Sequence, residues 1–188
     1  MTKHRHPRYA EAISLYSNLR RAAYARALDR CVSLGAATAK TRITSIDENA
    51  RAAYSATWRG MTHWSGAGGW PWDLMMKRVL QKPRSFHVAV WEGTELCGLA
   101  LGSVSKGRRQ ITLRFMESSP HPERPLRGAI AIIVFEAAAA LAEVLGADRI
   151  LLRNPLPVLL PFYARFGFTL ASENAGLVYF GKTLTYAR

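Results

Sequence analysis

Three titratable side chains of this sequence could take or give a proton during a reaction. Glu117 closes an otherwise apolar face of a strand-like run, Gln110 to Glu117. An apolar surrounding disfavours a charged carboxylate and would raise its pKa toward values useful for proton transfer. His63 and His121 are alternative bases because imidazole titrates near neutral pH. The simpler interpretations are a strand-end glutamate in solvent and histidines on a polar loop surface.

A loop rich in tryptophan and glycine is the second candidate for binding. Three of the five tryptophans, Trp64, Trp70 and Trp72, lie within nine residues of one another. Exposed indoles could stack on bases or grip an apolar molecule, and the intervening glycines would allow close approach. The alternative is that these rings fold inward and pin the loop. We therefore treat His63 and these three tryptophans as candidate substrate-binding residues.

Several other chemistries have no support in the motifs. There is no Gly-x-Ser-x-Gly elbow, His-Glu-x-x-His pair, Cys-x-x-Cys pair or Walker loop, so we expect no metal site. The Gly-rich loop does not follow a strand as a dinucleotide-binding fingerprint requires. Two cysteines, the lack of an apolar run near the N-terminus and the short apolar stretches predict a cytoplasmic protein without a signal peptide or membrane span.

The composition is that of a globular protein with a strong excess of positive charge. The chain has 188 residues, of which 49% are apolar, and carries a formal net charge of +13. The segment from Met1 to Arg42 alone contains nine basic and two acidic residues, a net charge of +7. A field of this sign attracts nucleic acid, acidic proteins or anionic headgroups. The alternative is that the charge serves solubility only.

The elements that would position these residues can be predicted from periodicity and turn signals. The first is a long N-terminal helix, Arg8 to Leu34, with an apolar stripe that would dock on the rest of the chain. Its arginines, including Arg20 and Arg21, would spread over the exposed arc. The remaining elements, in chain order, are strand 42–46, helices 48–58 and 74–80 capped by Asp47 and Asp73, strands 86–91, 96–104 and 110–117, helix 126–145, strand 149–152, helix 159–166 and strands 168–171 and 177–184.

This order of elements, together with one short motif, resembles a known superfamily. The motif is Phe162-Tyr163-Ala164-Arg165-Phe166-Gly167-Phe168, and it is similar to the Tyr-x-x-x-Gly-Phe of the GNAT superfamily of acyl-CoA-dependent N-acyltransferases. The resemblance covers about residues 40–184. It implies an α/β (α+β) fold with a mixed, mostly antiparallel central sheet flanked by helices. We expect a basic helical extension at 1–38 and a GNAT-like domain at 39–188.

The resemblance also implies where an acyl-CoA would bind. Its pantetheine arm would pair with the backbone of the fourth strand of that fold, near Phe115 and Met116. Its pyrophosphate would lie at the start of the following helix, where main-chain N–H groups favour an anion. That start comprises Arg124, Arg127, Gly128 and Ala129. The family pattern Gln/Arg-x-x-Gly-x-Gly/Ala is broken, because proline and isoleucine occupy its first and last places around Gly128.

For the reaction, the resemblance implies that Tyr163 protonates the departing thiolate, as a phenol is protonated at neutral pH. Glu117, directly or through water, would deprotonate the amine. Asn154 resembles a family asparagine that contacts pantetheine, although the gap from Asn154 to Tyr163 is longer than usual. The expected activity is transfer of an acyl group, acetyl by default, from acetyl-CoA or another acyl-CoA to an amine. The alternative is a non-catalytic module of the same fold.

The sequence does not identify the acceptor amine or the acyl chain. Small amines, proteins, tRNA and DNA bases all remain open, because a fold does not select among them. Nucleic acid engaged through the N-terminal helix is the partner that we expect, and docking or homodimerisation by that helix is the alternative.

Overall fold

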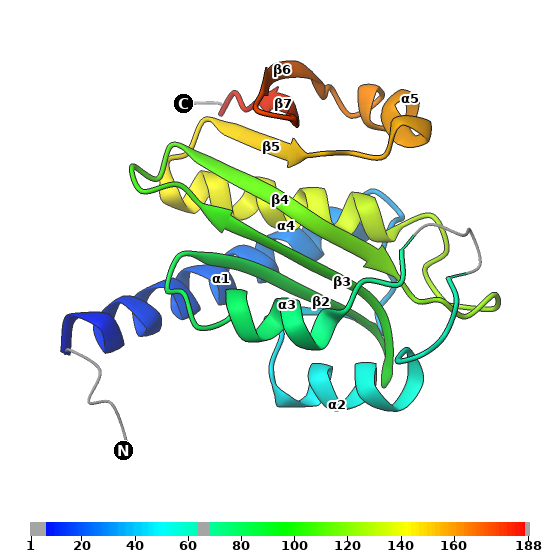
Figure 1. Cartoon of the computed structure of the whole chain (residues 1–188). Coiled ribbons are helices and arrows are strands. Elements are labelled where there is room, and N and C mark those ends of the chain that lie inside the picture. The colour runs from blue at the N-terminus through cyan, green and yellow to red at the C-terminus, as the bar shows by residue number, and fades with distance from the viewer. Residues whose placement is uncertain (1–6, 64–67, 187–188) are drawn as a thin grey trace.

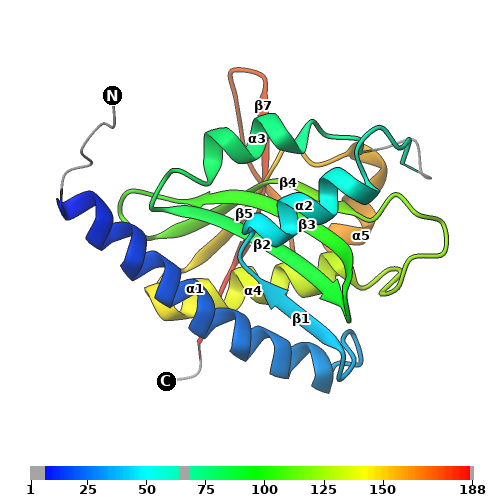
Figure 2. The same ribbon diagram turned by 90° about the horizontal axis from the view of Figure 1, so that it is seen from below.

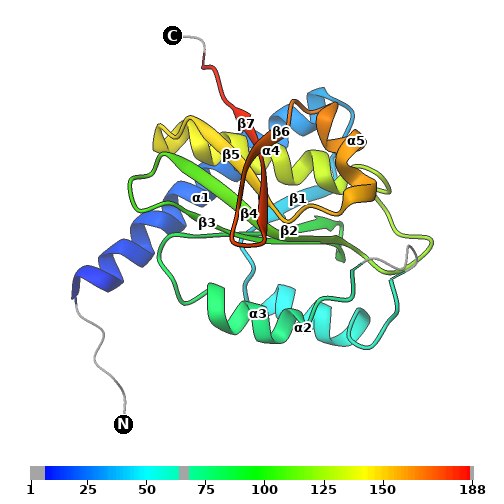
Figure 3. The same cartoon turned by 45° about the horizontal axis from the view of Figure 1, so that its top comes forward.

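A seven-stranded sheet forms the centre of the molecule in the computed structural model, which describes residues 7–63 and 68–186 (Figure 1). Its strand order is β1-β2-β3-β4-β5-β7-β6, and every pairing of neighbours is antiparallel except β4 with β5. Helices cover both faces, with α1 and α4 on one and α2 and α3 on the other (Figure 3). The predicted mixed, mostly antiparallel sheet flanked by helices is confirmed.

The elements follow the predicted order along the chain. The helices are α1 (Pro7–Ser33), α2 (Glu48–Thr57), α3 (Trp72–Val79), α4 (Ile130–Leu145) and α5 (Leu160–Ala164), the last preceded by the short 3₁₀ helix η1 (Pro157–Leu159). The strands are β1 (Thr41–Thr44), β2 (Ser85–Glu92), β3 (Glu95–Val104), β4 (Gln110–Ser118), β5 (Arg149–Arg153), β6 (Thr169–Asn174) and β7 (Leu177–Thr183).

Three helix starts show how local chemistry sets the boundaries. Asp47 caps α2 as predicted, because its carboxylate accepts a hydrogen bond from the N–H of Ala50 at 2.9 Å. Asp73 does not cap α3; it lies inside the first turn, 2.5 Å from the guanidinium of Arg59. The helix predicted from Leu126 begins only at Ile130, since Leu126 has a φ of +56°, which right-handed helix does not allow.

The N-terminal helix is part of the main core. It lies beside α4 (Figure 2) and buries side chains that are fully enclosed by the same hydrophobic cluster as α4 and the sheet. Tyr16 and Ala23 of the predicted stripe are buried, while Tyr9 and Ile13 are only partly covered. The predicted boundary at residue 38 therefore does not separate two hydrophobic cores.

The arginines of α1 are divided between internal contacts and solvent, which corrects the prediction that all of them spread over an exposed arc. Arg20 is buried, and its guanidinium donates to the carbonyl oxygen of Ser85 at 3.0 Å. Burial lowers the pKa of Arg20, and no carboxylate among the described residues lies within ion-pair distance of it. Arg30 pairs with Glu143 of α4 at 2.6 Å. Arg8 and Arg21 remain exposed.

The second core layer lies between the sheet and the helices α2 and α3. It contains Trp58, Trp72 and Met76 against Leu99 and Leu101 of β3. Over the described ranges, no helix is apolar enough over a sufficient length to cross a bilayer.

Candidate active site

The sheet opens between β4 and β5. These parallel strands pair over only four positions, from Gln110 with Arg149 to Leu113 with Leu152. Beyond Leu113, β4 continues to Ser118 while β5 ends at Arg153. A register shift between β3 and β4 places the extra residue Arg114 at this point. The β5-facing backbone edge of the last five residues of β4 therefore has no strand beside it within the described chain.

A cavity of about 510 Å³ occupies this opening. It brings together nine of the residues predicted from sequence, which come from five separate segments of the chain. They are His63, Trp70, Phe115, Met116, Glu117, Arg124, Gly128, Asn154 and Tyr163. Aliphatic and aromatic side chains make up most of the remaining wall, as is usual for a small-molecule site.

Glu117 lies at the end of the cavity on the α3 side. Its carboxylate accepts three N–H groups: Gly69 N at 2.7 Å, Trp70 N at 3.4 Å and the indole Nε1 of Trp72 at 2.7 Å. It is buried, but it faces N–H donors rather than the apolar surrounding predicted from the strand pattern. The arrangement holds the loop before α3 against the end of β4.

His63 lies next to Glu117 in the same wall of the cavity. A Cβ placed on Gly68 would be 2.7 Å from Glu117 Oε1 and 3.3 Å from His63 Cδ2, so the backbone of Gly68 packs against both side chains. The Nε2 atom of His63 lies 3.4 Å from the hydroxyl of Ser118. Burial lowers the pKa of His63 below its usual 6.5, and the field of Glu117 opposes this only in part. The lowered pKa favours the neutral form of the imidazole.

Tyr163 lies in the opposite wall, on α5. Its ring packs edge-on against Phe135 of α4, with the centroids 6.0 Å apart, and against Phe162 at 5.6 Å. Burial raises the pKa of this phenol, so it is protonated at neutral pH. Within the described residues its hydroxyl makes no hydrogen bond, which leaves the proton available to a molecule in the cavity.

The other end of the cavity is formed by the start of α4. Ala129 occupies the N-cap position, and no side chain among the described residues caps the first turn. Gly128 is exposed, has a φ of +81°, and would meet nothing within 4 Å if it carried a Cβ. Arg124 and Arg127 lie close enough for the charge of Arg127 to lower the pKa of Arg124, after the larger effect of burial. A helix start with amides, open space and two cations suits a phosphate.

The departure from the family pattern at Ile130 has a structural reason. Ile130 is buried and packs against Gly98 of β3, where a Cβ would lie only 2.6 Å from its Cγ2 atom. The side chain thus points into the sheet, away from the open space at Gly128. The isoleucine is accommodated by a glycine on the neighbouring strand and does not fill the anion position.

Several predicted site residues do not line this cavity. Trp72 is fully buried and reaches the site only through its hydrogen bond to Glu117, so the prediction that it contacts substrate is wrong. Arg127 and Ala129 are near the start of α4 but outside the wall. Asn154 lines the wall, but its side-chain oxygen accepts the N–H of Val178 at 2.8 Å. Trp64 lies outside the described residues.

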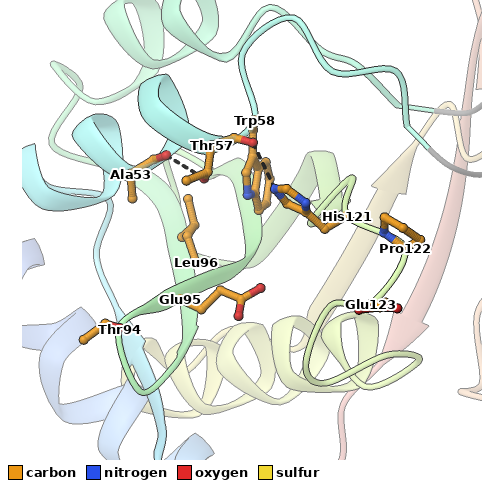
Figure 4. A pocket seen from close by; sticks show the side chains of 9 residues that line it. All are labelled: Ala53, Thr57, Trp58, Thr94, Glu95, Leu96, His121, Pro122 and Glu123. Carbon is orange, nitrogen blue, oxygen red and sulfur yellow. Dashed lines mark hydrogen bonds between the residues drawn. The ribbon is translucent and has the colours of Figure 1, made fainter.

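His121 belongs to a second, separate cavity of about 420 Å³ (Figure 4). Its Nε2 atom lies 3.2 Å from the carbonyl oxygen of Thr57, at the end of α2. His121, predicted as an alternative base, therefore does not line the cavity that contains Glu117, His63 and Tyr163. No cluster of three or more metal-ligating side chains occurs among residues 7–63 and 68–186.

Sequence comparisons find no relative: no protein-family model matches the chain, and no curated protein matches it. Solved structures do match. The ribosomal-protein-S18-alanine N-acetyltransferase from Escherichia coli has a TM-score of 0.57 and 16% identity, covering 79% of this chain and 96% of its own. The aminoglycoside 6'-N-acetyltransferase from Enterococcus faecium has a TM-score of 0.56 and 14% identity, covering 78% and 98%.

The chain has the GNAT fold. A further structure of this fold, the PaiA N-acetyltransferase from Thermoplasma acidophilum, was solved in complex with coenzyme A; it has a TM-score of 0.50 and 11% identity and covers 77% of this chain and 99% of its own. About a fifth of the present chain lies outside each of these matches to GNAT-fold structures.

Two arginines of the cavity wall were not predicted from sequence as site residues. Arg114 lines the opening at the β4 irregularity, and Arg153 lines it from the end of β5. The signal for Arg153 was available, because it alternates with the buried Leu152 and Ile150 and must point to the other face of the sheet. Arg114 could not be placed in this way, because a bulge changes the alternation that side-chain direction depends on.

Proposed function

We propose that this protein is an N-acyltransferase that moves an acetyl group from acetyl-CoA to an amine. The observation that carries the proposal is the cavity between the diverging strands β4 and β5, with a protonated phenol on one wall and a neutral imidazole on the other. The described residues leave about 510 Å³ open there, which favours a transferase over the alternative of a non-catalytic module.

The residues present fit the co-substrate. The unpaired edge of β4 from Phe115 onward offers N–H and C=O groups to the amides of a pantetheine arm. The uncapped start of α4, with Gly128, Arg124 and Arg127, offers amides and positive charge to a pyrophosphate. An acyl-CoA supplies an activated thioester carbonyl when it is bound.

Transfer requires a new N–C bond, cleavage of the C–S bond and removal of a proton from the amine. We assign the proton to His63, directly or through water, because its imidazole is neutral and lines the cavity. Glu117, which already accepts three N–H groups, holds the loop that brings Trp70 into the wall. Tyr163 then gives its proton to the thiolate. A backbone N–H of β4 would stabilise the negative charge on the carbonyl oxygen.

Calorimetry with acetyl-CoA and free CoA tests the donor site, and absence of binding would overturn the proposal. The acid role is tested with Tyr163→Phe, which should lower turnover of acetyl-CoA in the presence of an amine panel about 100-fold. The control is Tyr186→Phe, the same change at a hydroxyl that donates to Ala147 beyond the far end of α4. Full turnover in Tyr163→Phe, with chemistry rate-limiting, would exclude its role as the acid.

The base is assigned by comparing His63→Gln with Glu117→Gln. As the pH is lowered, kcat/KM should fall with the pKa of His63, which lies below its usual value. This dependence on pH should disappear in His63→Gln. Glu117→Gln should keep the same dependence on pH, while weakening the hydrogen bonds from Gly69 and Trp70 to this side chain. The opposite result would make Glu117 the base.

Contact with a polyanion through α1 is a separate part of the proposal. It is supported by the net charge of +13 and by the exposed Arg8 and Arg21.

The buried, unpaired cysteines Cys31 and Cys97 are compatible with the proposed cytoplasmic location, where thiols stay reduced.

A further inference from the structure

The charged side chains near Glu117 and His63, where the amine acceptor would bind, point to the class of that amine. This step rests on the proposed function. Among the described residues that line the cavity, Glu117 is the one carboxylate, and its oxygens already accept three N–H groups. Arg114 and Arg153 line the same cavity. A polycationic acceptor would therefore meet two guanidinium groups and no available carboxylate.

Arg153 lies on the face of the sheet toward α2 and α3, opposite the face that carries α4 and the expected phosphate site of the donor. Its neighbours Leu152 and Ile150 pack in the core layer of α4, so Arg153 points to the other face by strand alternation. That face also carries Phe115 and Glu117, which contact Trp70 and Trp72. The expected pyrophosphate site at the start of α4 belongs to the opposite face (Figure 3).

Both arginines are accessible to a ligand. Arg114 is exposed and Arg153 is half-buried. Neither guanidinium has a carboxylate within 4.0 Å among residues 7–63 and 68–186, whereas five other arginines of the chain do. The helices α2 and α3 cover β2 and β3 and leave β5 to the side, as Figures 1 and 3 both show. Arg153, which lines the cavity, therefore lies on a strand that these two helices do not cover.

We infer that the acceptor is an amine that carries an anionic group, a carboxylate or a phosphate, which Arg153 binds while the amine lies near His63. A guanidinium matches both anions because its fork donates two parallel hydrogen bonds. Arg114 adds positive charge from the β4 side. This assignment selects against polyamines and for zwitterionic or phosphate-bearing amines.

The test is calorimetric binding of matched probes to the full chain, with and without saturating CoA. O-phosphoethanolamine is compared with ethanolamine, β-alanine with β-alaninamide, and both anionic probes with spermidine. The anionic member of a pair should bind about tenfold more tightly than the neutral one, since charge-assisted bidentate bonds are strong. The pair with the larger ratio distinguishes phosphate from carboxylate.

Arg153→Gln should reduce that ratio to below about twofold, and Arg153→Lys should restore part of it. Arg149→Gln is the matched control: it makes the same charge change four residues earlier on the same face of β5, outside the cavity wall, and should keep the full ratio. CoA affinity of each variant reports that the fold and donor site are intact.

Equal affinity for anionic and neutral probes, no binding of any anionic probe, or tighter binding of spermidine overturns the inference. It is also overturned if Arg153→Gln weakens CoA and leaves the probe ratio unchanged, because the arginine would then belong to the donor site. Failure of CoA to bind overturns the proposed function instead, and the probe ratio measured without CoA still decides the acceptor class.

Discussion

The indole nitrogen of Trp72 lies 2.7 Å from Oε2 of Glu117, so a fully buried tryptophan of α3 holds a carboxylate at the end of β4. This hydrogen bond joins the second core layer to the wall of the cavity. It makes the position of the loop from Gly68 to Trp70 depend on a side chain that a substrate cannot touch.

Trp72→Phe should lower the free energy of unfolding by about 1–3 kcal/mol, because the buried carboxyl group of Glu117 loses a hydrogen-bond donor. It should also lower kcat/KM while leaving CoA affinity unchanged. Urea denaturation and calorimetry measure the two effects. Trp58→Phe is the control, since the buried Nε1 of Trp58 has no partner among the described residues and the change removes no hydrogen bond. Equal destabilisation of both variants would show that ring packing, not the hydrogen bond, is what matters.

Gly98→Ala should destabilise the protein by about 1–3 kcal/mol, because the new Cβ would lie 2.6 Å from Ile130. In a double-mutant cycle, Gly98→Ala should destabilise the protein less in the Ile130→Ala background than in the unchanged protein, since the smaller side chain removes the clash. Gly107→Ala, where the nearest atom would be at an ordinary 3.7 Å, is the control. Additive effects in the cycle would contradict the packing of these two residues.

Acid should weaken the fold through His87. Its Nδ1 atom accepts the N–H of Ile46 at 3.0 Å, and burial, aided by the charge of Arg20, lowers its pKa from 6.5 to about 3. The unfolded chain therefore binds this proton first as the pH falls. The stabilisation is complete above pH 6.5 and is lost toward pH 3, at up to about 1.4 kcal/mol per pH unit.

His87→Asn measures that contribution, because an amide oxygen can still accept from Ile46 and does not titrate in this range. The difference in free energy of unfolding between the two proteins should shrink from pH 7 to pH 4. A difference that is constant with pH would mean that His87 is not the titrating group.

The exposed arginines of α1 should contribute to nucleic-acid affinity. If Arg8 and Arg21 each contact one phosphate, changing both to Gln should make the plot of log affinity for duplex DNA against log salt shallower by about 1.8. Changing Arg26 and Arg30 instead, which pair with Glu143, should have less effect. No affinity of the unchanged protein at low salt would end this proposal. Deletion of α1 is a poor test, because it would remove Tyr24 and expose core residues that α1 covers, such as Phe86.

Element order could be predicted from sequence because it follows from periodicity and turn residues, and the fold followed from that order and the motif around Tyr163. Phe115, Met116 and Tyr163 of the cavity followed from the resemblance to the GNAT superfamily, whereas Arg114 and Arg153, which also lie on strands, were not predicted. The contacts of Glu117 were not predictable, because its donors come from a loop about 45 residues away and one is an indole on a buried helix face. The docking of the α1 stripe on the rest of the chain was predicted, but the burial of Arg20 was not, since an arginine on a helix is usually a surface residue.

The four-residue pairing of β4 with β5 also has a mechanical meaning. Apart from α4, it is the principal seam between the block β1–β4 and the block β5–β7–β6. A molecule that binds to both strands would hold the two blocks together and slow the local opening of the sheet between β4 and β5. Amide hydrogen exchange in β5 and β7 should therefore report occupancy of the cleft, while the amides of β2 and β3, which pair over their whole length, should exchange at the same rate in either state.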